Sequence, residues 1–195
     1  MPLSRRAKFA IAQLGKKPNA KASLALLLTV ADLPGENWKV MDERSWRAGT
    51  VGPDTPWGQR TRAARNIVGW RSFEQQSAEK WMWIQVVPYV SDEDARSALA
   101  GATLGDGIPN SRAEVQLVNQ VTIEDVEIDG VNAARVLVQS TSGPRGDSEA
   151  RTIYSAVNSF VAVEAFSSFS GSWGEGEMSS IVTLQANRIK KAAQT

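Results

Sequence analysis

The stretch SLALLLTVADLPGENWKV, residues 23–40, sets the start of the fold. Its first half is rich in Leu and Ala, which favour helices, so the sequence predicts a helix over 22–31. Pro34 disfavours helical geometry at Leu33, and Gly35 permits a turn, so the helix ends at Asp-Leu-Pro-Gly. A strand is predicted to follow over residues 37–48.

The same apolar run also raises the question of an export signal, because six basic residues and no acidic ones precede it. In an export signal the apolar core follows the basic residues directly. Here Gly-Lys-Lys-Pro-Asn-Ala-Lys intervenes, and the run is short. We therefore expect residues 1–21 to form a basic arm or helix, residues 22–195 to form one domain, and the protein to be cytoplasmic. Export or attachment to the cell envelope is the alternative.

The composition limits the chemistry that this chain can perform. Its 195 residues are 42% apolar and 22% charged, which is typical of a soluble globular protein. Cysteine and histidine are both absent, which excludes disulfides, thiolate catalysis and the usual general base near neutral pH. No apolar run is long enough for a transmembrane helix. We therefore expect a non-catalytic protein that carries no cofactor and no metal.

Strand and helix patterns occur in blocks along the chain, without the βαβ alternation of parallel sheets. Helices are predicted over 91–105, where Ser91 caps and Gly105 terminates, and over about 176–192. Further strands are predicted over 66–76, 79–89, 113–128, 131–140, 150–157 and 160–166. Asp129-Gly130 and Asn158-Ser159 indicate tight turns. The pattern predicts an α+β fold: a mostly antiparallel sheet of about six or seven strands, with helices on both faces.

Residues 113–128 combine an irregular apolar pattern with a dense acidic cluster. The apolar phase jumps after Ile123, which predicts a bulge near Glu124–Asp125. Asp125, Glu127 and Asp129 would share one strand face, where a hard cation such as calcium could bind. A polar outer edge that discourages sheet-to-sheet pairing is the favoured interpretation, because a straight strand cannot curl around an ion.

Tryptophan and arginine supply the candidate binding residues. Trp81 and Trp83 lie two apart on a predicted strand and so point the same way, either into the core or towards an apolar ligand. A long polar loop is predicted over 49–65. It holds most of a basic and aromatic cluster, for which a solvated loop is the simpler interpretation: Trp57, Arg60, Arg62, Arg65, Trp70 and Arg71. The residues predicted to bind a ligand or partner are Trp57, Arg60, Arg62, Trp70, Arg71, Trp81 and Trp83.

At LALLLTVADLPGENW, residues 24–38, the chain resembles a family of actinobacterial proteins. This family comprises small lipoproteins of the LpqN type and the extracellular sensor domains of some mycobacterial serine/threonine kinases. VEIDGVNAARVLV at 126–138 and QANRIKK at 185–191 also fit it. The resemblance implies a PsbP-like α/β/α sandwich and a non-catalytic binding or accessory role, often at the cell envelope. The chain lacks the lipobox cysteine of the lipoproteins.

Three functions remain open from the sequence. The first is a non-catalytic accessory or binding protein that recognises a partner protein or a small apolar ligand. The second is a histidine-free enzyme that uses carboxylates, such as Glu74 or Glu164 with Tyr154. The third is a nucleic-acid-associated protein, since residues 1–65 carry 12 lysines and arginines against 5 acidic residues. A pI of about 8.0 is low for a dedicated nucleic-acid binder.

Overall fold

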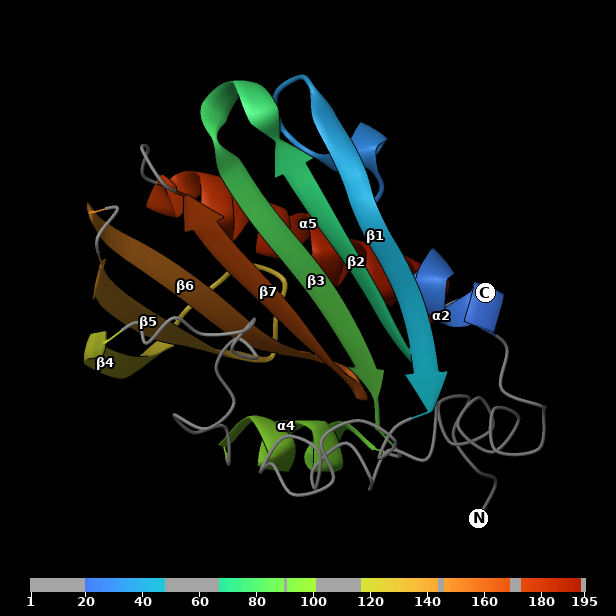
Figure 1. The fold of residues 1–195 in the computed structure, drawn as a ribbon. Coiled ribbons are helices and arrows are strands. Elements are labelled where there is room, and N and C mark those ends of the chain that lie inside the picture. The colour runs from blue at the N-terminus through green and yellow to red at the C-terminus, as the bar shows by residue number, and fades with distance from the viewer. Residues whose placement is uncertain are drawn as a thin grey trace, which may run out of the picture.

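The structure, a computed structural model, describes residues 20–47, 67–89, 91–100, 117–143, 146–168 and 173–193. Its strands are β1 (Trp38–Arg47), β2 (Ile67–Gln75), β3 (Lys80–Pro88), β4 (Leu117–Val126), β5 (Ala133–Gly143), β6 (Gly146–Val157) and β7 (Phe160–Ser168). They form one antiparallel sheet in the order β1-β2-β3-β7-β6-β5-β4 (Figure 1). The helical elements are α2 (Ala20–Ala25), η1 (Val30–Asp32), η2 (Gln76–Ala78), α4 (Asp92–Ala100) and α5 (Glu175–Ala192). The predicted α+β class is confirmed.

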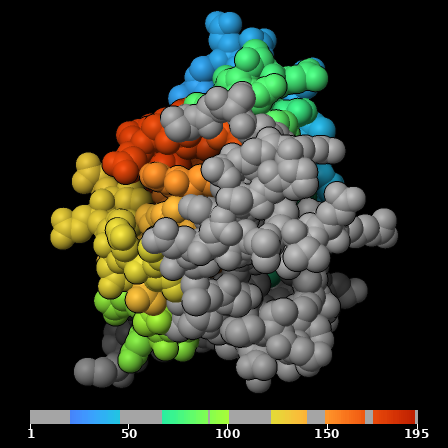
Figure 2. Space-filling view, turned by 60° about the vertical axis from the view of Figure 1, so that its left-hand side comes forward, coloured from blue at the N-terminus to red at the C-terminus, as the bar shows by residue number. Residues whose placement is uncertain are grey.

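Helices cover both faces of this sheet, as predicted. In Figure 1, α5 crosses behind the strands, while α4 lies at their lower end. Seen from the side, α5 (red) and α4 (green) lie on opposite sides of the yellow strands β4 and β5 (Figure 2). Two hydrophobic clusters follow from this arrangement, one between α5, α2 and the sheet, and one between α4 and the sheet. We call the two sides of the sheet the α5 face and the α4 face.

The centre of the sheet is buried on both sides, which explains its apolar sequence. β3 pairs with β7 along its whole length, and residues 84–87 of β3 are buried on both faces. Two turns that the sequence predicts are confirmed by their backbone geometry. Gly130 has a φ of 82° between β4 and β5, and Asn158 has a φ of 51° between β6 and β7. Ser91 caps α4 as predicted, since its Oγ accepts the Asp94 amide hydrogen at 3.0 Å.

The predicted helix over 22–31 is wrong, because α2 ends at Ala25. The backbone beyond it bonds to side chains from β2 and α5 instead of continuing the helix. Arg71 donates to the carbonyls of Leu27 and Leu28, and Gln185 bonds to the backbone of Leu26 and Leu28. These long-range bonds satisfy the same peptide groups that a helix would have paired locally.

The short η1 turn (Val30–Asp32) ends at the first residue of the Asp-Leu-Pro-Gly stretch, which then changes the direction of the chain. The Asp32 carboxylate accepts hydrogen bonds from the Thr29 backbone N–H and Oγ1, at 2.6 and 2.7 Å, and lies 2.6 Å from Arg188. Partial burial raises the pKa of Asp32, but the Thr29 hydrogen bonds and the Arg188 charge outweigh it, so the net pKa is lowered. Gly35 then turns the chain with a φ of 81°. Trp38 starts β1 and donates its indole N–H to the Pro34 carbonyl at 2.8 Å.

Two predictions about β4 are wrong. The pairing register from Gln120 to Val126 is regular, and the irregularity lies between Val118 and Gln120 instead of near Glu124–Asp125. The apolar phase changes because Ile123 packs in the α4 cluster, whereas Ile128, beyond the strand, packs in the α5 cluster. Since β4 ends at Val126, the expected face shared by three carboxylates does not form. β4 is an outer strand of the sheet, as the edge interpretation requires.

Candidate functional site

Three of the predicted binding residues lie together on the α4 face. Trp70 of β2 pairs with Gln85 of β3. Trp83 and Trp81 lie two and four residues from Gln85 along β3, so their side chains are on the same side of the sheet as Trp70. All three indoles are partly buried. We call Trp70, Trp81 and Trp83 the tryptophan face. Side chains two residues apart, and side chains across neighbouring strands, share a face, so the predicted common direction of Trp81 and Trp83 is confirmed.

Polar groups flank these rings. The guanidinium of Arg44 on β1 lies 5.8 Å from the centre of the Trp70 ring, within the range of a cation–π contact. Arg44 also bonds to Asp42 at 2.6 Å through its Nε. The side chain of Gln85 lies between Trp70 and Val163 in the register and is buried, and its Nε2 has no hydrogen-bond partner in the described part of the chain. This face therefore combines flat apolar surface with both a charged and a neutral donor.

Sequence reasoning missed Arg44 and Gln85. Arg44 lies opposite Trp70, and Gln85 lies opposite the same residue from the other side. The only signal for either residue is the strand register, which one strand's sequence does not reveal.

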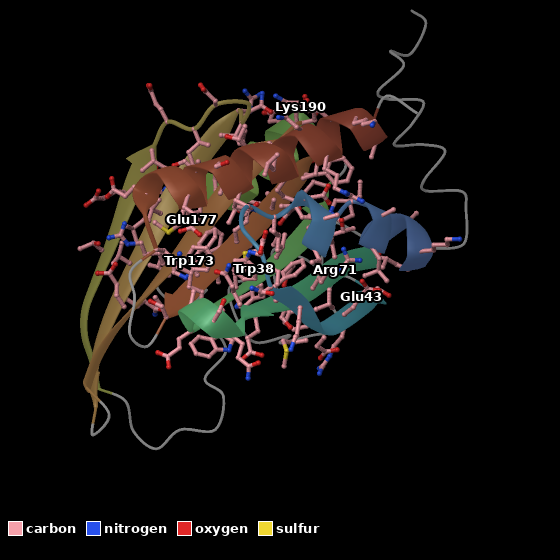
Figure 3. All side chains as sticks on the ribbon, turned by 90° about the horizontal axis from the view of Figure 1, so that it is seen from above. Trp38, Glu43, Arg71, Trp173, Glu177 and Lys190 are labelled. Carbon is pink, nitrogen blue, oxygen red and sulfur yellow. The ribbon has the colours of Figure 1, made fainter. Side chains whose placement is uncertain are left out.

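Arg71, also predicted to bind, lies on the opposite side of the sheet from Trp70. Its side chain is 10% exposed and forms an ion pair with Glu43 of the neighbouring β1 (Figure 3). Its Nη1 group donates to the carbonyls of Leu27 and Leu28, just beyond the end of α2. These contacts assign Arg71 a structural role in joining β1, β2 and the opening stretch. Adjacent residues on a strand point to opposite faces, so Trp70 and Arg71 do not form one site.

The other three predicted residues, Trp57, Arg60 and Arg62, lie outside the described residues. The long polar loop predicted over 49–65, to which they belong, falls there too. Their part in binding therefore stays a prediction.

The carboxylates considered for catalysis are not gathered in one place. Glu164 of β7 is fully buried on the α5 face, where burial raises its pKa well above the usual value. Tyr154 of β6 and Glu74 of β2 lie on the α4 face, as their partners Val163 and Trp81 do. The sheet separates Glu164 from both. Within the described ranges, no group of acidic side chains is arranged to hold a metal ion.

Comparison with known proteins gives a likeness of fold. The extracellular domain of PknH from Mycobacterium tuberculosis superposes with a TM-score of 0.53 at 11% identity, covering 93% of this chain and 100% of that one. An Rv0999 ortholog from Mycobacterium smegmatis superposes with a TM-score of 0.40 at 7% identity, covering 80% of this chain and 90% of that one. No protein-family model and no curated sequence matches the chain. At such low identity the PknH domain shows a shared fold and nothing about activity.

The part of the chain that the structure describes contains no candidate for a membrane-spanning helix. None of the helices there is both long and apolar enough to cross a bilayer.

Proposed function

We propose that this chain is a non-catalytic binding domain whose tryptophan face recognises a small apolar ligand or an apolar segment of a partner protein. The observation that carries this proposal is the gathering of Trp70, Trp81 and Trp83 on one side of the sheet, none of them fully buried. Aromatic side chains offer large contact areas at low entropic cost, and they are enriched where proteins bind ligands and partners.

The chemistry of the face favours a flat ligand with an acidic or polar edge. The indole rings of Trp81 and Trp83 suit stacking, while Arg44, which also pairs with Asp42, lies beside Trp70 at the rim and could contact an acidic group. Charge at an exposed rim adds selectivity more than affinity. An aromatic carboxylate satisfies both requirements.

The carboxylate-enzyme alternative has less support. Its residues fall on two sides of the sheet, so a substrate could not touch Glu164 together with Tyr154 or Glu74. General acid–base catalysis needs its groups within hydrogen-bonding reach of one substrate.

The family resemblance supports a binding role and suggests a location. The likeness to the extracellular domain of PknH agrees with the sequence resemblance to mycobacterial kinase sensor domains. We propose membership of that wider group, including its LpqN-type lipoproteins and PsbP-like fold, and an exported or envelope location in preference to the cytoplasmic one. The division into a basic arm over 1–21 and a single domain over 22–195 is part of the same proposal.

Native mass spectrometry of the protein purified from its own organism tests the proposal. We expect the wild type to carry a bound small molecule or peptide that is lost from a Trp70→Ala/Trp83→Ala variant. A Trp38→Phe variant is the matched control, because Trp38 is buried on the other face. Equal retention by the two variants would rule out the tryptophan face as the site. The intact mass shows whether residues before α2 remain attached, as a cytoplasmic location requires.

A further inference from the structure

A carboxylate and a hydroxyl without partners lie in the interior beneath α5. Glu164 and Ser155 are both 0% exposed. Neither oxygen of the Glu164 carboxyl, nor the Ser155 Oγ, has a hydrogen-bond partner in the described part of the structure. Buried polar groups in proteins are nearly always paired, so each exception calls for a physical explanation.

The strand register brings the two side chains together. Glu164 on β7 lies between Ile84 of β3 and Ile153 of β6, and Ser155 is two residues along β6 from Ile153. Glu164 and Ser155 are therefore diagonal neighbours on the α5 face. Phe166 is on the same face, two residues from Glu164, and belongs to the main core cluster.

The helix above them supplies no partner. Its buried residues are apolar except for one glutamine: Met178, Ile181, Val182, Gln185, Ala186 and Ile189. Gln185 already uses both ends of its amide on the backbone of Leu28 and Leu26. The carboxyl of Glu164 consequently faces an apolar surface.

The cations that the structure describes on the α5 face are engaged elsewhere, and Arg188 of α5 itself pairs with Asp32 at 2.6 Å. Arg71 pairs with Glu43, two strands away from Glu164. Lys80 bonds to Glu177 at 2.6 Å near the start of α5, and Arg151 bonds to Glu149 at 2.6 Å. Burial raises the pKa of Glu164 well above its usual value, its own backbone N–H lowers it in part, and none of the described residues contributes a charge.

We propose that Glu164 is a proton-controlled switch for the packing of α5. The neutral carboxylic acid is compatible with the closed interior, whereas an unpaired carboxylate ion there is strongly disfavoured. Loss of the proton is therefore coupled to separation of α5 from β7, which admits water to the carboxylate. This inference concerns the α5 face and is independent of the tryptophan face.

Opening at this place would disturb the aromatic side chains that pack beside α5 in the main core cluster. Trp173, just before α5, stacks on Trp38 of β1 with ring centres 5.8 Å apart and meets Phe166 edge-on at 4.9 Å (Figure 3). A shift of α5 would disturb this aromatic group, so the switch has a spectroscopic signature as well as an effect on amide protection.

Hydrogen exchange as a function of pH tests the switch. Protection factors for the α5 amides of the wild type should fall by up to about tenfold per pH unit above the ordinary glutamate pKa, until the native pKa is reached. In Glu164→Gln, which has the same shape and cannot ionise, they should stay constant. Glu124→Gln is the matched control, because Glu124 lies in the same register row on the exposed edge strand, and it should behave like the wild type.

Coincident profiles for the wild type and Glu164→Gln would overturn the proposal, as would a fall in protection that spares α5. Glu164→Leu provides a second variant if Glu164→Gln folds poorly, and it too should lose the pH dependence. Near-ultraviolet circular dichroism, to which Trp38 and Trp173 contribute, should change with pH in the wild type and in Glu124→Gln, and should stay constant in Glu164→Gln. A wild-type spectrum that is constant across the range in which α5 protection falls would also contradict the switch.

Discussion

One buried side chain of α5, that of Gln185, binds the backbone of the opening stretch at Leu28. Gln185 Oε1 accepts the Leu28 amide hydrogen at 3.1 Å, and its Nε2 donates to the Leu26 carbonyl at 2.7 Å. The side-chain amide of Gln185 thus takes the place of a backbone hydrogen-bond partner for Leu28, which lies 157 residues away in the chain. The end of α2 and the position of α5 are fixed by the same two bonds.

Replacing this glutamine should destabilise the protein markedly. Gln185→Leu fills a similar volume but leaves the Leu28 N–H and the Leu26 carbonyl without partners, which costs about 2–4 kcal/mol of unfolding free energy for the two groups together. Asn187→Leu, on the exposed side of the same helix, should change stability by less than about 0.5 kcal/mol. Urea unfolding of the two variants makes the comparison. Equal stability would mean that the buried amide is not needed to hold the opening stretch.

Arg71 and Glu43 should contribute unequally, although they form one ion pair. Arg71 is almost fully buried and also binds the Leu27 and Leu28 carbonyls, so Arg71→Met should cost about 3 kcal/mol. Glu43→Gln keeps a hydrogen-bond acceptor for Arg71 but leaves the buried guanidinium charge unpaired, so it should cost less than Arg71→Met, about 1–2 kcal/mol. Thermal unfolding measured at two salt concentrations separates the two contributions, since salt weakens the ion pair with Glu43 but not the bonds of Arg71 to the buried carbonyls. A larger loss in Glu43→Gln than in Arg71→Met would contradict this assignment.

Gly69 allows α2 to approach β2 closely. A methyl group at Gly69 would lie 2.6 Å from the Ser23 carbonyl oxygen, so α2 would have to move. We expect Gly69→Ala to cost about 1–3 kcal/mol, as for other overpacked sites. Gly176→Ala in α5 has open space around it and should stabilise the protein by about 0.5–1 kcal/mol. Differential scanning calorimetry of the pair should therefore show shifts of opposite sign.

The buried carboxyl of Glu164 should make the protein less stable as the pH rises. Its pKa is raised in the folded state, so at pH values between the ordinary and the raised pKa the unfolded chain releases the proton first. The free energy of unfolding falls as the pH rises through that window. The neutral Glu164 carboxyl makes its full contribution to stability only below the ordinary glutamate pKa. Glu164→Leu should remove this slope and gain about 1–3 kcal/mol at its alkaline end, because an unpaired buried group is lost. Parallel stability profiles for the two proteins would contradict the burial of an unpaired carboxyl.

Most of the fold follows from local signals in the sequence. The apolar alternation in β3, the turn residues Gly130 and Asn158, and the Ser91 cap each act within a few residues, and each is confirmed. The end of α2 could not be predicted in this way. Leu and Ala favour helix at 24–31, but distant donors from β2 and α5 take the carbonyls there.

The candidate site was likewise predictable only in part. Trp81 and Trp83 share a face because side chains alternate along any strand, so their common direction was predictable. Trp70 and Arg71 are neighbours in the sequence, and the same alternation already places them on opposite faces. Trp70, Arg44 and Gln85 lie beside these two tryptophans because of the register between β1, β2 and β3, which the sequence of a single strand does not reveal.

The indole N–H signals of the tryptophans test the central claim most directly, because each reports on one ring. Small aromatic carboxylates are titrated into labelled protein, and each indole signal is assigned by substitution of its tryptophan. Binding at the proposed face should shift the signals of Trp70, Trp81 and Trp83, leave those of buried Trp38 and Trp173 in place, and weaken in Arg44→Ala. Shifts confined to Trp38 and Trp173 would contradict the tryptophan face as the binding site, and no shift with any of these compounds would contradict its recognition of aromatic carboxylates.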